Sequence, residues 1–139
     1  MGMFDSLNVS ATGLTAERLR MDVTAENLAN AQTTRGADGQ PYRRKEVVLA
    51  ERQGPASFDA TSTPGGVEVA SIAQDQTPLK QVYDPGHPDA DANGYVTMPN
   101  VNTVTEMTDL ISSSRAYEAD VTAMQTAKQM FVKTLDILR

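Results

Sequence analysis

The residues best suited to chemistry lie in a short segment rich in proline, residues 84–89, which holds the only histidine of the chain. His87 stands close to Asp84 and Asp89, and a histidine oriented by a carboxylate is the usual arrangement of a general base. However, the chain has no cysteine, no serine lies nearby, and the neighbouring prolines favour turns. We interpret His87 as a turn residue, with a catalytic base as the alternative, and predict no catalytic residues.

A second pattern suggests a cation site. Asp89, Asp91, Asn93 and Gly94 match the first six positions of a calcium-binding loop. That loop needs a bidentate glutamate at its twelfth position, which here is Asn100, and a helix on each side, which nearby prolines disfavour. Because Asp and Asn side chains also stabilise turns, we predict a turn and no metal site, with cation binding as the alternative.

Composition and charge argue against several classes of function. The formal net charge is −6, whereas proteins that bind nucleic acid carry a basic patch or stripe. Aromatic residues make up only 5% of the chain, which is few for an enzyme whose pocket is walled by large rings. Most of the negative charge lies in the middle of the chain. The two nearly neutral ends can therefore pack against copies of themselves without strong repulsion.

The sequence also shows no recognisable targeting signal. No run of residues approaches the ~20 apolar residues of a transmembrane helix, and the start of the chain lacks the features of a cleavable signal peptide. The absence of cysteine leaves the redox compartment open. We expect a soluble protein that binds no cofactor and does not insert into a membrane, and that uses another signal if it leaves the cytoplasm.

Both ends of the chain show the apolar spacing of long helices. Seven of eight positions from Phe4 to Leu28, spaced alternately by three and four, are apolar, as are eight of ten from Met107 to Leu138. Thr103 and the glutamate three residues later have the spacing of a capping box. We predict helices of about 40 and 50 Å and an elongated molecule. The predicted seam between them comprises Leu7, Leu14, Met21, Leu28, Tyr117, Val121, Met124, Phe131 and Leu135.

A second apolar stripe lies roughly opposite the first on each helix. One seam is enough to pair two helices, so the second stripes need other neighbours, which predicts lateral packing of subunits. The alternative is that the middle of the chain folds back over them. These second stripes are Val9, Ala16 and Val23 near the N-terminus, and Ala116, Ala123, Met130 and Ile137 near the C-terminus.

The middle of the chain is predicted to be extended and partly β. All seven prolines lie between Pro41 and Pro99, which disfavours long helices there. The basic run at residues 43–45 is most simply a solvated strand edge. Short segments with β propensity occur at residues 46–50, 67–72, 82–83 and 95–98, and residues 54–66 are predicted to form a loop.

Several segments carry a family resemblance. Residues 25–31 match the core Ala-x-Asn-Leu-Ala-Asn-Ala of the N-terminal motif of bacterial flagellar rod and hook proteins, within a similar segment at residues 10–34. Segments at residues 39–43, 83–96, 98–101 and 114–119 resemble the proximal-rod members of that family. The resemblance covers about Phe4 to Leu138 apart from the predicted loop. The residues that carry the motif are Asn27, Leu28, Ala29, Asn30, Pro99, Asn100, Arg115 and Tyr117.

This resemblance implies a structural subunit of the proximal rod of the flagellar basal body, the tubular drive shaft that transmits torque. It implies assembly with copies of itself, with other proximal and distal rod subunits and with the adaptor to the membrane ring. Export across the inner membrane to the periplasm by the flagellar type III apparatus is implied as well. Gln32 replaces an asparagine that many relatives have, and we attach no functional weight to that difference.

The predicted fold is mainly α with a small β part. Residues 1–35 and 101–139 form two helices that pair as a coiled-coil-like layer, and residues 36–100 form a small middle domain. Each large side chain buried in assembly contributes roughly 1.5 to 3 kcal/mol, so the helices are expected to become fully ordered only beside their neighbours. The alternative function is a coiled-coil adaptor or secreted effector that binds a single partner.

Overall fold

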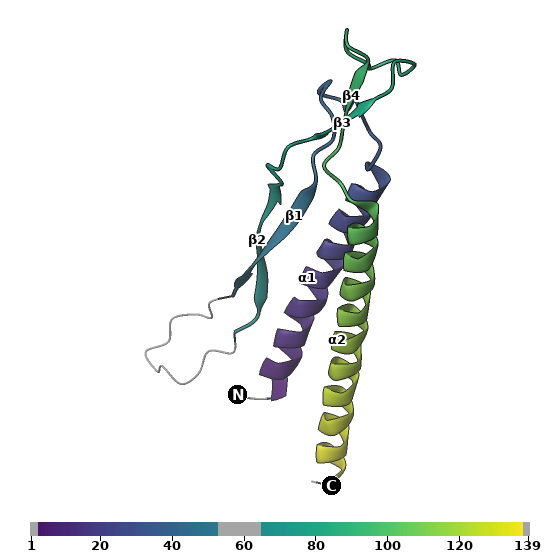
Figure 1. The fold of residues 1–139 in the computed structure, drawn as a ribbon. Coiled ribbons are helices and arrows are strands. Elements are labelled where there is room, and N and C mark those ends of the chain that lie inside the picture. Colours follow the sequence, from purple (N-terminus) through teal and green to yellow (C-terminus); the bar gives the residue numbers. More distant parts are fainter. Residues whose placement is uncertain (1–2, 53–64, 138–139) are drawn as a thin grey trace.

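The computed structural model describes residues 3–52 and 65–137, and it contains two long helices and two small sheets (Figure 1). Four short strands lie between the helices in the sequence, close to the segments predicted to be strands, so the fold is mainly α with a small β part, as predicted. The predicted loop at residues 54–66 falls almost entirely outside the described residues. The elements are α1 (Met3–Ala29), β1 (Lys45–Glu51), β2 (Val67–Gln74), β3 (Lys80–Tyr83), β4 (Tyr95–Met98) and α2 (Thr103–Ile137).

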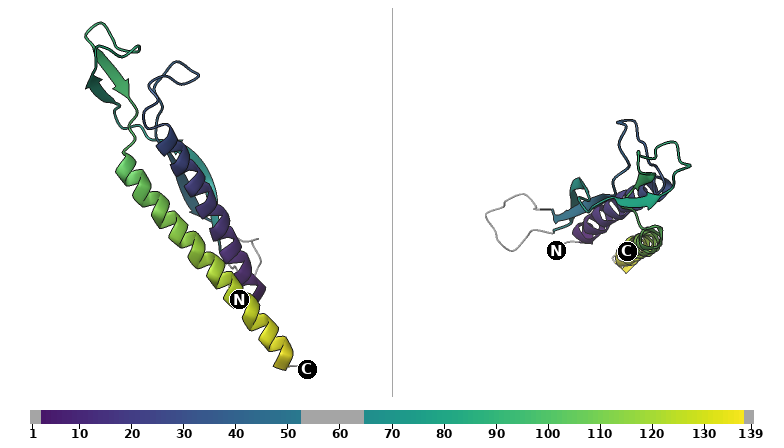
Figure 2. Two further views of the ribbon diagram at one scale, coloured as in Figure 1. Left: turned by 90° about the vertical axis from the view of Figure 1, so that its right-hand side faces the viewer. Right: turned by 45° about the horizontal axis from the view of Figure 1, so that its top comes forward.

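Helices α1 and α2 lie side by side and run in opposite directions, which brings the start of α1 and the end of α2 to the same end of the molecule (Figure 1). Asn27 donates a hydrogen bond to Glu106, and a Cβ atom added at Gly13 would stand 2.7 Å from Oδ2 of Asp120. With 27 and 35 residues, the helices are about 40 and 52 Å long. The molecule is elongated, as predicted (Figure 2). Neither helix is long and apolar enough, over its described residues, to cross a membrane.

Strands β1 and β2 form an antiparallel ribbon that folds back along α1, so that α1 lies between the ribbon and α2 (Figure 2). The ribbon is tied to the helix where the backbone N–H of Val67 donates to Oγ1 of Thr12 at 3.2 Å. Beneath the ribbon, Ala16 and Val23 are only 3% and 6% exposed. The structure therefore has the fold-back that the sequence left as an alternative, and it covers this part of the second stripe of α1.

The second stripe of α2 is not covered in the same way. Ala123 is exposed, and Met130 is 54% exposed. At the start of α1, Val9 is also 37% exposed. The expectation that the second stripes need neighbours from other subunits therefore applies to these positions and not to Ala16 or Val23.

The apolar core is small for a chain of this length. The whole chain exposes 9901 Å² of accessible surface, whereas a compact monomer of 15.0 kDa exposes about 7,000 Å². Only a few apolar side chains are fully buried, so hydrophobic packing alone provides little to fix how the elements fit together. Over the described residues, the buried hydrophobic side chains are Ala16, Val23, Val96, Val101 and Ala127.

Strands β3 and β4 form a second antiparallel pair beyond the ends of the helices (Figure 1). In the turn between them, Oδ1 of Asp91 accepts hydrogen bonds from the backbone N–H groups of Asn93 and Tyr95 at 2.8 and 2.9 Å. Gly94 completes the turn with φ +81°. This confirms the turn predicted for the Asp-x-Asp-x-Asn-Gly segment.

Replacing Gly94 by alanine is expected to lower the free energy of unfolding by about 2 kcal/mol. A positive φ costs an L-residue roughly 1 to 2 kcal/mol, and the added Cβ would also stand 2.9 Å from the Tyr83 ring. Gly39→Ala is the matched control, because Gly39 has φ +73° but nothing within 4 Å of an added Cβ. Urea unfolding followed by circular dichroism should show the larger loss for Gly94→Ala. Equal losses would contradict the role given to the Tyr83 contact.

Candidate functional site

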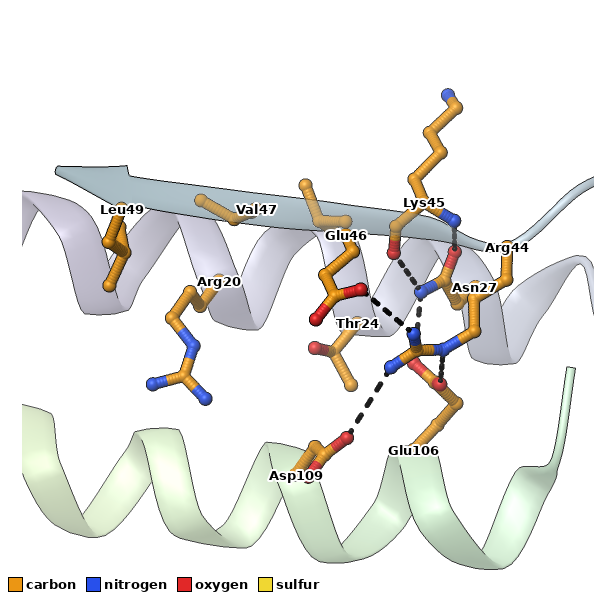
Figure 3. Close-up of a pocket in the computed structure, with 11 residues that line it drawn as sticks. Arg20, Thr24, Asn27, Arg44, Lys45, Glu46, Val47, Leu49, Glu106 and Asp109 are labelled. Atoms are coloured by element: carbon orange, nitrogen blue, oxygen red, sulfur yellow. Dashed lines mark hydrogen bonds and ion pairs between the residues drawn. The ribbon is translucent and has the colours of Figure 1, made fainter. Parts of the chain in front are cut away.

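A buried asparagine joins three separate segments of the chain (Figure 3). Asn27, near the end of α1, is 1% exposed. Its Nδ2 donates to the carbonyl of Lys45 at 2.8 Å and to Oε2 of Glu106 at 2.9 Å. Its Oδ1 accepts from the backbone N–H of Lys45 and from the hydroxyl of Tyr42, each at 2.9 Å. All four hydrogen-bonding positions of this amide are therefore used. We call Asn27, Tyr42, Arg44, Asn100 and Glu106 the polar hub.

Glu106 holds the first turn of α2 to the hub. Its carboxylate is 1% exposed, and its second oxygen, Oε1, accepts a hydrogen bond from Nε of Arg44 at 2.6 Å. The glutamate was expected to pair with Thr103 in a capping box, and the structure corrects this. The backbone N–H of Val104 is capped instead by Oδ1 of Asn102 at 3.1 Å, because the Glu106 carboxylate turns inward to Asn27 and Arg44.

Arg44 is the cation at the centre of the hub. Its hydrogen bond to Glu106 raises the pKa of the guanidinium above its usual value, against the opposing effect of burial. Its two terminal nitrogens lie 3.5 Å from Glu46, 3.9 Å from Asp75 and 3.7 Å from Asp109. The interpretation of this residue as part of a solvated strand edge is wrong, since its side chain is only 21% exposed.

Asn100 fixes the chain just before α2. Its Oδ1 accepts from the backbone N–H of Arg44 at 2.8 Å, and its Nδ2 donates to the carbonyl of Asp75 and to Oγ1 of Thr77. The backbone N–H of Thr77 in turn lowers the pKa of the Asp75 carboxyl. Pro99 is fully buried beside this contact. Asn27 and Asn100, both predicted as motif residues, therefore bond the backbone of two consecutive residues, Lys45 and Arg44, at the start of β1.

A cavity of about 360 Å³ adjoins the hub between α1, β1 and α2 (Figure 3). Arg20 lines it, with its guanidinium 2.9 Å from Glu17. The cavity is also lined by Val23, Leu49 and the carboxylates of Glu46, Glu106 and Asp109. No group of three or more residues that could hold a metal ion occurs in the described part of the chain. The arrangement is suited to holding three segments in one position.

The predicted chemical candidates outside the hub are held in turns. Nδ1 of His87 accepts a hydrogen bond from the backbone N–H of Asp89 at 3.1 Å. The Asp89 carboxylate accepts from Oγ1 of Thr34 at 2.8 Å and lies 3.7 Å from Arg35. These contacts tie the β3–β4 turn to the segment after α1. Asp89 therefore connects the two segments, whereas the hydrogen bond of His87 stays within its own loop.

The predicted seam residues lie at intermediate burial. Ala16 and Val23 of α1, and Ala127 of α2, are more buried than any seam position. Their role in a subunit interface stays a prediction. Half-buried are Leu7, Leu14, Met21, Leu28, Tyr117, Val121, Met124 and Phe131, whereas Leu135 is 52% exposed.

Three other motif residues, Ala29, Asn30 and Arg115, are not members of the hub. Asn30 closes the end of α1, where Nδ2 donates to the carbonyl of Glu26 at 2.9 Å and Oδ1 accepts from Thr33. Ala29 and Arg115 are exposed. The hub thus contains Asn27 and Asn100 and leaves these others outside.

Sequence reasoning missed Tyr42, Arg44 and Glu106 as members of the hub. Arg44 was visible only as part of a basic run, and Glu106 only as a capping residue. Burial raises the pKa of Tyr42 to about 12, and the charges of Glu26 and Glu106 add to that shift. No pattern in the sequence marked Glu106 or Arg44 as buried, because their partners lie far away in the chain.

Comparison with known proteins identifies the class first. A family model described as flagella basal body rod protein matches residues 7–37. A second, described as the C-terminal part of the flagellar basal body rod FlgEFG proteins, matches residues 92–137. Both helices and most of the hub lie within or beside these regions. The chain is therefore an axial protein of the flagellar basal-body rod.

Curated relatives narrow this class. The chain is 48% identical to the flagellar basal-body rod protein FlgC of Borreliella burgdorferi, over 100% of this chain and 99% of the relative. It is 48% identical to the FlgC protein of Bacillus subtilis, over 99% of each chain. Identity to the FlgC protein of Salmonella typhimurium is 44%, over 99% of this chain and 98% of the relative. The chain belongs to the FlgC family of flagellar basal-body rod proteins.

Replacing Asn27 by alanine is expected to lower the free energy of unfolding by about 3 kcal/mol. The change removes the Asn27 partner of Oε2 of Glu106, of the Tyr42 hydroxyl and of both backbone groups of Lys45, while Oε1 of Glu106 keeps its bond to Arg44. Asn30→Ala is the matched control, because Asn30 bonds only within its own turn, and it should cost about 1 kcal/mol or less. Urea unfolding of both variants measures the difference. A comparable loss at Asn30 would sink the assignment of Asn27 as the central residue.

Stability is expected to fall between pH 10 and pH 12, and Tyr42→Phe should remove part of that fall. A folded-state pKa of about 12, against 10.0 for the free side chain, means that the folded protein holds the phenol proton more tightly. The resulting stabilisation is fully present below pH 10 and is lost as the pH rises through 12. Thermal unfolding at a series of pH values tests this. Tyr83→Phe serves as the control, because Tyr83 is 64% exposed and lies outside the hub.

Proposed function

We propose that this chain is a structural subunit of the proximal rod, which polymerises with copies of itself and with other rod proteins into the tubular drive shaft. The observation that carries the proposal is the contrast between a small buried core and the large exposed surface of two long helices. Apolar side chains left exposed along both helices are favourable only when neighbours cover them.

The predicted seam residues fit this role. All but Leu135 are half-buried in the single chain, so each has apolar surface left for a neighbour. Burying the rest of each large side chain contributes up to roughly 1.5 to 3 kcal/mol. Assembly therefore adds the hydrophobic stabilisation that the isolated chain lacks. We propose that the helical segments 1–35 and 101–139 form the inner, axial layer and that residues 36–100 form an outer domain.

Export through the flagellar type III apparatus to the periplasm is part of the same proposal. A chain with few buried apolar residues, no cysteine and helices completed by neighbours is easily unfolded for passage through a narrow channel. The polar hub then selects the native arrangement of α1, β1 and α2 on refolding. Torque is transmitted through the packed helices.

The hub supports a structural role and not catalysis. The Glu106 carboxylate is bonded to Asn27 and Arg44, and Glu46, Asp75 and Asp109 lie within 4 Å of the same guanidinium. A general base needs a proton acceptor that can reach a substrate. In the hub, the buried acceptors are already used to hold the chain together.

Replacing Leu28 by aspartate is expected to abolish incorporation into rods. Leu28 is a half-buried seam residue next to the hub, and a carboxylate there would be desolvated when a neighbour packs against it. Ala37→Asp, in the exposed turn after α1, is the matched control and should assemble normally. Cells that lack the native protein are complemented with each variant, and detergent-resistant basal bodies are tested for the chain.

Two results of this experiment would count against the proposal. Motile cells with normal rods that contain the Leu28→Asp variant would contradict the role of the seam. A native chain that never copurifies with basal bodies, and instead binds one soluble partner at fixed stoichiometry, would indicate an adaptor or effector.

A further inference from the structure

An exposed stripe runs along α1 on the side turned away from α2. Arg18, Asp22, Ala25 and Ala29 are spaced by four, three and four residues, so they share one face of the helix, and all four are exposed. Gly13 and Asn27 mark the side of α1 that meets α2. At about 100° per residue, the stripe lies roughly opposite that side.

A matching stripe runs along α2 on the side turned away from α1. Met107, Ile111, Arg115 and Glu118 are spaced by four, four and three residues, and all are exposed. The two apolar members are 54% and 56% exposed, which is unusual for side chains of that size. Helical geometry again places this stripe roughly opposite the contacts made by Glu106 and by Asp120.

The charges of the two stripes are complementary in order. Along α1 the stripe reads basic, acidic, small, small, and along α2 in reverse it reads acidic, basic, large apolar, large apolar. No ion pair within 4 Å joins these charged side chains to another residue of the described part of the chain. Because α1 and α2 are antiparallel, a second copy placed alongside in the same orientation presents its α1 stripe to the α2 stripe in matching order.

The axial register can be derived from the contacts inside the chain. Asn27 lies beside Glu106, and Gly13 lies beside Asp120. In both pairs the α2 residue number is 133 minus the α1 residue number, which defines the register inside one chain. A second copy shifted by about three residues, roughly 4.5 Å along the axis, brings four pairs together at once. These pairs are Arg18 with Glu118, Asp22 with Arg115, Ala25 with Ile111, and Ala29 with Met107.

We propose that the α1 stripe of one copy docks on the α2 stripe of the next copy of this chain. The contact joins two different surfaces, so it leaves each copy with one free stripe and continues as a row of subunits. The small side chains of Ala25 and Ala29 leave room for Ile111 and Met107, and the two ion pairs fix the register. This inference rests on the proposed function and names the copy-to-copy contact within it.

Charge reversal tests the contact and the identity of the partner together. Arg18→Glu and Glu118→Arg each place like charges opposite one another and are expected to lower incorporation into basal bodies about tenfold. The double variant restores the pair only if both stripes belong to copies of the same chain, so it should return incorporation to near the native level. Glu68→Arg, a reversal at an exposed position of β2 outside both stripes, is the matched control and should have no effect.

Cross-linking gives a second measurement that does not depend on a loss of assembly. The native chain has no cysteine, so Ala25→Cys combined with Ile111→Cys introduces the only two thiols. The two positions face away from each other within one chain, and oxidation of isolated basal bodies is therefore expected to give dimers and longer ladders. Each single-cysteine variant should give no ladder.

The outcomes separate this inference from the proposed function. If the native chain is absent from basal bodies, the proposed function fails and the stripe contact fails with it. If the native chain and the control assemble but the double reversal stays as defective as the single ones, the stripe meets a different protein and the copy-to-copy contact is wrong. Assembly of the double-cysteine variant without any ladder would overturn it as well.

Discussion

The structure depends on one buried amide. Asn27 uses all four of its hydrogen-bonding positions to hold α1 against β1 and against the first turn of α2, and Glu106 passes the connection on to Arg44. Few apolar side chains are buried elsewhere, so hydrophobic packing selects weakly among alternative positions of the helices. A satisfied polar network selects strongly, because any shift leaves buried donors and acceptors without partners. The hub therefore provides the specificity that the core does not.

A chain that is fixed by polar contacts and keeps apolar surface exposed is well suited to be a subunit of an assembly. The hub lies at one end of the helix pair, next to the β3–β4 strands, and the helices extend from it for most of the length of the molecule (Figure 1). Along that length the two helices keep much of their apolar surface half-exposed. The single chain thus fixes its own geometry with polar contacts and leaves hydrophobic burial to its neighbours. The motif segment of α1 serves both purposes, since Asn27 points into the hub while Ala25 and Ala29 face outward.

Most of the fold followed from local patterns, but the depth of burial along each helix did not. The proline-free apolar repeats predicted α1 and α2, and β-prone segments between turns predicted the strands. The same repeats pointed to a seam at Leu7, Leu14 and Met21, whereas the structure buries Ala16 and Val23 more deeply. An apolar stripe shows that one face of a helix is buried, either inside its own chain or in an assembly. It does not show which neighbour covers that face. Ala16 and Val23 of the second stripe are buried because the β1–β2 ribbon folds back over them.

The sequence by itself determined the secondary structure, the elongated shape and, through the motif at residues 25–31, the family. These features depend on helix length and on residue types close together in the chain. Only the tertiary structure decided that Asn27 meets Glu106, 79 residues away, and that Arg44 and Tyr42 complete the same site. A carboxylate or guanidinium looks the same in a sequence whether it faces water or a buried partner. The difference arises when the ribbon and α2 are brought against α1, because the desolvation that makes those bonds specific exists only in the folded chain.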